Sequence, residues 1–110
     1  MIFVIIKINA LPEKCQEFFQ TLGGIVARTR KKRGCISCHF YRDAENENTF
    51  GLVEEWETQE DLDSHLQSDD IAVFRASMDF LSEPPDIKFS RLMPTNRSEV
   101  LTNVEAVMQN

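Results

Sequence analysis

The sequence lacks any apolar run as long as a membrane-spanning helix, which needs about 18 residues or more. Its most apolar stretch, Met1 to Ile8, is also shorter than the apolar core and flanks of a secretion signal. These absences argue against a membrane protein and give no indication of export. We therefore expect a cytoplasmic protein that does not interact with membranes.

Positive charge is scarce as well. Lysine and arginine together number 12 against 18 aspartate and glutamate residues, which leaves a net charge of −6. A chain with this balance is not expected to bind nucleic acid or an anionic membrane surface. Its 110 residues are the length of one domain that can bury a core without disulfide bonds.

Cysteine is present only three times, and an odd number without an export signal predicts free thiols. Cys35 and Cys38 have the spacing of a redox motif, but they fall within a predicted strand, where residues three apart point to opposite faces. A zinc site would need further ligands that the sequence does not offer nearby. We expect core or half-buried thiols, with no metal and no cofactor. A glycine-rich phosphate loop and a nucleophile elbow are also absent.

The most informative stretch runs from Phe50 to Ser68 and predicts a strand that turns directly into a helix. Side chains alternate up to Trp56, the only tryptophan of the chain. Thr58 follows as a helix N-cap with Asp61 three residues later, in the manner of a capping box. One face of the predicted helix then carries Leu62, His65 and Leu66. If the protein has a small-molecule pocket, this corner is expected to form part of its wall.

The remaining patterns predict an alternating order of strands and helices. Strands are expected at 2–9, 35–42, 49–57 and 86–92, and helices at 12–32, 59–67 and from 68–70 to the Pro84–Pro85 pair. This order is the split βαββαβ arrangement of ferredoxin-like α+β domains. The predicted fold is a four-stranded antiparallel sheet with helices on one face.

The first strand is apolar at nearly every position, which predicts burial on both of its faces. In a fold whose helices cover one face only, the other face would expose a large apolar surface. A homodimer that covers this surface is the simplest expectation.

The C-terminal segment, residues 94–110, lies beyond the predicted domain of residues 1–93. Asn96 or Ser98 is suited to cap an amphipathic helix whose apolar residues are Val100, Leu101, Val104, Val107 and Met108. We hypothesise that this helix docks on the domain or crosses to a partner subunit.

Several motifs together resemble the antibiotic biosynthesis monooxygenase domain. They are the helix start Pro12-Glu-Lys, the segment Arg33-Gly-Cys-Ile-Ser, and Tyr41-Arg-Asp at the end of the second strand. The strongest motif is Glu54-Glu-Trp56, followed after eight residues by His65-Leu66, which is similar to the Glu-x-Trp and His-Leu signature of the family. The resemblance covers residues 1 to about 93.

This resemblance implies a dimeric α+β barrel in which each subunit has a pocket between its sheet and its helices. It also implies a cofactor-independent monooxygenase that acts on a small phenolic or quinol-like aromatic. Trp56 would stack on the substrate, and His65 would act as base or hydrogen-bond donor with a pKa near neutrality. The residues expected to bind the substrate are Glu54, with Arg42 or Lys7 as its ion-pair partner, and Leu62, Phe74 and His39. If His39 does not bind the substrate, we expect it to lie on the surface or in the dimer interface.

The sequence departs from the family pattern at several positions. Many members have a second histidine where this chain has the segment 68–71. Lys7, and Arg75 or Ala76, stand at positions that haem-degrading members use, which argues against haem degradation. Leu52 and Leu62 replace an asparagine and a tyrosine of some phenol-oxidising members. Two alternatives therefore stay open: a non-enzymatic dimeric domain that binds a small molecule, and an isomerase of a small metabolite.

Overall fold

The structure, a computed structural model, describes residues 1–91 and 97–109, with the backbone alone for residues 97–101. Its elements in chain order are β1 (Ile2–Asn9), α1 (Cys15–Thr29), β2 (Cys35–Arg42), β3 (Thr49–Trp56), α2 (Gln59–Leu66), α3 (Asp69–Ala76), β4 (Asp86–Arg91) and α4 (Arg97–Met108). Short 3₁₀ turns, Pro12–Lys14 and Ser77–Phe80, precede α1 and follow α3.

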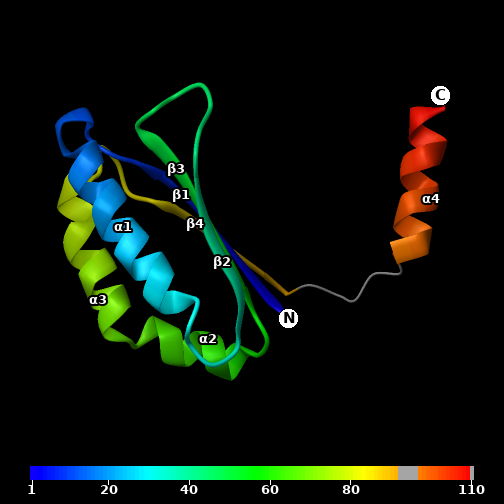
Figure 1. The fold of residues 1–110 in the computed structure, drawn as a ribbon, viewed down its shortest axis with the longest axis horizontal. Helices are drawn as coiled ribbons and strands as arrows, with labels where there is room; N and C mark the ends of the chain where they lie inside the picture. Colours follow the sequence, from blue (N-terminus) through cyan, green and yellow to red (C-terminus); the bar gives the residue numbers. More distant parts are fainter. Residues whose placement is uncertain (92–96, 110) are drawn as a thin grey trace.

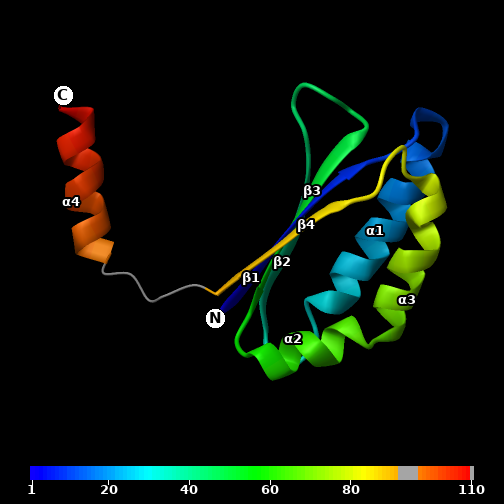
Figure 2. The ribbon, with the colours of Figure 1, turned by 180° about the vertical axis from the view of Figure 1, so that it is seen from behind.

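The strands form one antiparallel sheet in the order β2-β3-β1-β4. Helices α1, α2 and α3 cover one face of this sheet and leave the other face bare (Figure 1). The view from behind shows the same two layers (Figure 2). The predicted ferredoxin-like α+β fold is confirmed.

In the single chain, the central strand β1 is buried on one face only, and burial of its other face in a homodimer stays a prediction. Ile2, Val4, Ile6 and Ile8 point to the helices and are at most 7% exposed, whereas the residues between them are half-buried or exposed. The outer face of the sheet still carries apolar side chains, because Ile5 is 42% exposed and Tyr41 is 57% exposed there. Both are interspersed with polar residues such as Lys7.

The second strand contains an irregularity that the sequence did not predict. Cys35 pairs with Trp56 and Cys38 with Glu54, and the register shifts between Cys35 and Ser37. Trp56 and Glu54 are two apart on β3 and share a face, so the bulge brings both cysteines to the helix-covered side. The expectation that they point to opposite faces is therefore wrong. Both are free thiols, and burial raises the pKa of Cys38 to about 12.

Strand β4 is exposed along its whole length, although its alternation predicted a half-buried strand. Ile87 pairs with Ile6 and Phe89 with Val4, so their side chains point to the helix-covered side of the sheet. They are nevertheless 41% and 55% exposed, respectively. The physical reason is that β4 is an edge strand, which the helices only partly cover.

The corner between β3 and α2 forms as its sequence predicts. The Thr58 hydroxyl accepts a hydrogen bond from the Asp61 amide at 3.1 Å and donates one to the Asp61 carboxylate at 2.8 Å. Helix α1 ends at Thr29, slightly earlier than predicted, and Gly34 has a φ of 81°. A Cβ atom on Gly34 would clash with the Asp61 side chain, so two features require glycine there.

Helix α4 forms within the predicted C-terminal extension and is drawn apart from the sheet in both ribbon views (Figures 1 and 2). Its side chains Val104, Val107 and Met108 are exposed. The proposed cap Asn96 and the side chains of Ser98, Val100 and Leu101 lie outside the described residues. Among the described helices, none is long and apolar enough to cross a membrane.

Two glycine substitutions test this account of the backbone. Gly34→Ala is expected to lower the free energy of unfolding by at least about 1 kcal/mol, because it combines a positive φ with a steric clash. Gly23→Ala, inside α1, is the matched control and is expected to stabilise by about 0.5–1 kcal/mol, since its Cβ would meet only Phe40 at 3.9 Å. Urea unfolding of the two variants measures both values. Equal effects of the two substitutions would contradict the account.

Candidate functional site

A cavity of about 200 Å³ lies between the sheet and helices α2 and α3. Its lining is apolar except for Glu54, His65 and Arg75. The apolar residues come from both layers and are Val4, Ile6, Leu62, Leu66, Ile71, Phe74, Met78, Ile87 and Phe89. An apolar space with a few polar groups at its wall is the usual form of a small-molecule site.

Glu54 is the buried carboxylate of this cavity. It is only 4% exposed, and the Trp56 indole Nε1 donates a hydrogen bond to its Oε1 at 2.7 Å. Burial raises the pKa of Glu54, opposed by the Trp56 hydrogen bond and by the charge of Lys32. The expected ion-pair partners, Arg42 and Lys7, do not hold it, because Arg42 lies over the rings of Phe19 and Phe50, and Lys7 is exposed on the outer face of the sheet.

Trp56 is 0% exposed and does not line the cavity. Its ring stacks on the His65 imidazole, with 4.7 Å between the centroids and 27° between the planes. Trp56 therefore contacts two of the three polar residues of the cavity lining, Glu54 through its indole N–H and His65 through its ring face.

His65 is 2% exposed and has different surroundings at its two ring nitrogens. Nδ1 lies 2.9 Å from the Lys32 ammonium. Nε2 lies 3.6 Å from Glu54 Oε1 and is buried without a hydrogen-bond partner. Burial, followed by the charge of Lys32, lowers the pKa of His65 to about 4, while Asp70 opposes the shift. The expected pKa near neutrality is wrong, and the folded protein holds a neutral imidazole at pH 7.

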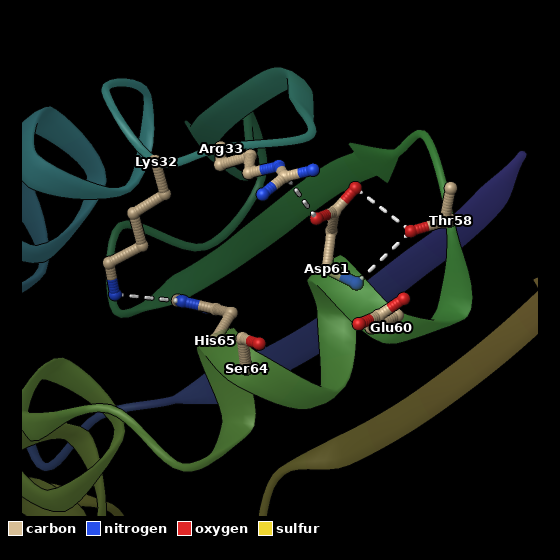
Figure 3. Close-up of a pocket in the computed structure, with 7 residues that line it drawn as sticks. All are labelled: Lys32, Arg33, Thr58, Glu60, Asp61, Ser64 and His65. Atoms are coloured by element: carbon tan, nitrogen blue, oxygen red, sulfur yellow. Dashed lines mark hydrogen bonds and ion pairs between the residues drawn. The ribbon is translucent and has the colours of Figure 1, made fainter.

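The other side of His65 borders a second, polar hollow of about 390 Å³ (Figure 3). Lys32 and Arg33 reach it from the segment after α1, and the rest of its lining is Thr58, Glu60, Asp61, Ser64 and His65. His65 is the residue common to the two linings, so the apolar cavity and the polar hollow meet at this side chain.

A charged cluster fixes Lys32 beside the ring. Its ammonium lies 2.9 Å from Asp70 Oδ2 and 2.9 Å from the Ser68 hydroxyl. Arg28 binds the other oxygen of Asp70 at 2.6 Å. These hydrogen bonds and charges lower the pKa of Asp70 against the opposing effect of burial. The cluster joins the end of α1 to the start of α3.

The structure brings together four of the site residues predicted from sequence. Glu54, Leu62, His65 and Phe74 all line the cavity. His39 lies elsewhere: it pairs with Val53 on the outer face, is exposed, and has the Arg30 guanidinium at 3.4 Å.

Sequence reasoning missed Lys32 and Asp70. Lys32 at the end of the predicted helix 12–32, and Asp70 in the first turn of another predicted helix, are ordinary dipole-matched residues, so neither indicated this site. Within the described residues, no group of three or more His, Cys, Asp or Glu side chains has an arrangement that could hold a metal ion.

The lowered pKa of His65 predicts a specific loss of stability in acid. An imidazole with a pKa of 6.5 unfolded and about 4 folded contributes stability that is complete above pH 6.5 and is lost as pH falls toward 4. The loss is expected to reach roughly 3 kcal/mol at most. Urea unfolding of the wild type across this range measures it.

His65→Gln is expected to remove this part of the acid sensitivity, because glutamine does not titrate. His39→Gln, which removes the exposed histidine, is expected to keep it. Contributions from Asp70, and from Glu54, whose raised pKa acts in the opposite direction, are common to all three proteins, so the difference between the wild type and His65→Gln gives the part due to His65. An equal loss in His65→Gln and the wild type would show that the His65 pKa is not lowered.

Comparison with known proteins agrees with the fold and the motif. The chain is 33% identical over 90 residues to an uncharacterized protein of Synechocystis sp., covering 81% of this chain but only 61% of that protein's length.

Among solved structures, a conserved protein from Methanosarcina mazei has a TM-score of 0.78 at 31% identity, covering 84% of this chain and 92% of that one. An antibiotic biosynthesis monooxygenase shares the fold at 19% identity, with a TM-score of 0.79 and coverage of 86% and 100%. The statistical model of one family, antibiotic biosynthesis monooxygenase, matches residues 1–77. The chain belongs to the antibiotic biosynthesis monooxygenase family.

Proposed function

We propose that the protein is a cofactor-independent monooxygenase that acts on a small phenolic or quinol-like aromatic. The observation that carries the proposal is the apolar cavity with a buried carboxylate and a neutral imidazole side by side at its wall. Family membership supports the general reaction class. A volume of about 200 Å³ favours one ring or two fused rings, because pockets for drug-sized ligands measure roughly 300–1,000 Å³.

The reaction needs no protein-derived electrons. A phenolate is more easily oxidised than its phenol. The substrate can therefore give an electron to O₂ once its hydroxyl group has lost its proton. Overall, the phenol loses two hydrogens and gains one oxygen atom to become a quinone, and the second oxygen atom leaves as water. The site has to remove the phenolic proton, stabilise the oxyanion and exclude bulk water from the reactive intermediates.

Glu54 is the proposed base. Burial raises its pKa toward the working pH, which makes it a stronger proton acceptor than an exposed carboxylate. His65 is the proposed donor to the oxyanion, since its Nε2 adjoins Glu54 and has no hydrogen-bond partner. Trp56 acts as a positioning residue, because its indole N–H orients the Glu54 carboxylate.

The competing proposal is a domain that binds an aromatic ligand without turnover. The segment 68–71 favours it, because the family resemblance leads one to expect a second histidine there and the segment has none. Ser68 there accepts a hydrogen bond from Lys32 and lies outside the cavity lining. Binding of a ring compound without oxygen uptake would select this alternative.

Oxygen uptake by the purified protein tests the proposal directly. A panel of hydroquinones and dihydroxynaphthalenes is expected to include a substrate that raises uptake above its own autoxidation. Glu54→Gln keeps an oxygen for the Trp56 hydrogen bond but removes the base, so kcat/KM is expected to fall at least tenfold, or about 1.4 kcal/mol. Trp56→Phe is expected to lower kcat/KM less, because the base remains.

The neighbouring residue provides the matched control. Glu55 lies on the same strand with its side chain on the other face, so Glu55→Gln is expected to retain wild-type uptake. Absence of uptake with every compound, from a folded protein, would overturn the monooxygenase proposal.

We also propose that the protein is a homodimer joined through the outer face of the sheet. Ile5 and Tyr41 leave this face partly apolar, and a second copy would cover them. Helix α4 would add to the contact by docking on either subunit.

Sedimentation measures this assembly. Ile5→Glu, at the centre of the outer face, is expected to shift the protein from dimer to monomer. Val73→Glu replaces a similarly exposed apolar residue on the helix side, 44% against 42%, and is expected to leave the dimer intact. Truncation after Met93 tests the contribution of α4. A monomeric wild type would contradict the proposal.

A further inference from the structure

The Lys32 ammonium has three polar contacts, each at 2.9 Å: His65 Nδ1, the Ser68 hydroxyl oxygen and Asp70 Oδ2. An ammonium group has three N–H donors and no lone pair. Three acceptors therefore use its full donor capacity, and Lys32 has no means of accepting a hydrogen bond from the ring.

This arrangement determines which nitrogen of His65 carries the proton. Because Lys32 only donates, Nδ1 has to be the accepting, unprotonated nitrogen. A proton on Nδ1 would point an N–H group at the cation 2.9 Å away. The neutral ring then carries its hydrogen on Nε2.

The Nε2–H group lies on the Glu54 side of the ring and has no hydrogen-bond acceptor, and both His65 and Glu54 line the apolar cavity. Glu54 Oε1 is 3.6 Å away, and the same oxygen already accepts the Trp56 indole hydrogen bond at 2.7 Å. A buried donor without a partner is rare in folded proteins, because the loss of its hydrogen bonds to water is not compensated. A ligand oxygen in the cavity would satisfy it.

We propose that Lys32 is a positioning residue of this site: held by Asp70 and Ser68, it fixes His65 as an Nε2–H donor, so that the cavity receives a hydrogen-bond-accepting oxygen of an aromatic ligand. Phenolate and quinone oxygens both belong to this class. The catalytic meaning of the assignment rests on the proposed function, whereas the assignment itself concerns only Lys32, His65 and their contacts.

Charged groups face the His65 ring from each element that packs against it, and their arrangement supports the assignment. Glu54 faces it from β3, Asp70 from the start of α3, and Lys32 from the segment after α1, with Arg28 bound to Asp70. Of these groups, Lys32 lies nearest the ring, and it disfavours the imidazolium. Removal of Lys32 leaves the two carboxylates, which attract a second proton to His65.

Nitrogen NMR of the imidazole rings tests the proposal without any substrate. The chain has two histidines, and His39→Gln assigns their signals. Long-range ¹H–¹⁵N spectra at neutral pH are expected to show His65 with a bare Nδ1 and a protonated Nε2. In Lys32→Met, the His65 titration midpoint is expected to rise by at least one pH unit, a tenfold gain in proton affinity.

Lys31→Met removes the same charge from the adjacent, exposed lysine and is expected to leave the midpoint unchanged. If Lys32→Met does not fold, because Asp70 loses a partner, Lys32→Gln removes the charge, retains an N–H donor for Asp70 and keeps the test. A proton on Nδ1 in the wild type would overturn the proposal. So would a wild-type His65 midpoint in the folded Lys32 variants.

The outcome is separate from that of oxygen uptake. If no compound is oxidised but the spectra show the Nε2–H ring and its dependence on Lys32, the monooxygenase proposal fails and the positioning role stands. If uptake is found and the ring carries its proton on Nδ1, the reverse holds.

Discussion

The burial of a carboxylate beneath the helices is the constraint on which the site depends. A charged group in an apolar interior is stable only where donors or opposite charges compensate it. Glu54 has one direct donor, the Trp56 indole, and next to it a neutral histidine rather than a cation. The cation that serves the region, Lys32, lies on the far side of that histidine and is held by Asp70. The row of polar contacts from Glu54 in the core to Lys32 and Asp70 therefore passes through a single imidazole ring, that of His65.

Local patterns were sufficient to predict the elements of the fold. The alternation in β3, the Thr58 cap and the stripe on α2 all involve residues a few positions apart, so the sequence contains the whole signal. Burial was harder to predict, because it depends on neighbours distant in the sequence. Alternation in β4 does not reveal that it is an edge strand, which the helices only partly cover.

The bulge in β2 explains two further differences between expectation and structure. A shift of one residue reverses the face on which every later side chain of a strand lies. It brings Cys38 inward beside Cys35 and turns His39 outward, away from the cavity. Glu54 and His65 were predictable because they stand in one motif. Lys32 was not, since it meets His65 across 33 positions of sequence and each residue fits an ordinary helical role.

The exposed strand β4 has a consequence for the ligand recognition proposed above. Among the described residues it pairs with β1 alone, and its Ile87 and Phe89 border the cavity. Its other edge therefore offers unpaired backbone amides and carbonyls close to the cavity. Main-chain groups of this kind have the same hydrogen-bonding capacity whatever the side chain. If the cavity binds the proposed aromatic ligand, the backbone of β4 would accommodate polar substituents on its outward end, and the apolar wall with Glu54 and His65 would select the buried ring.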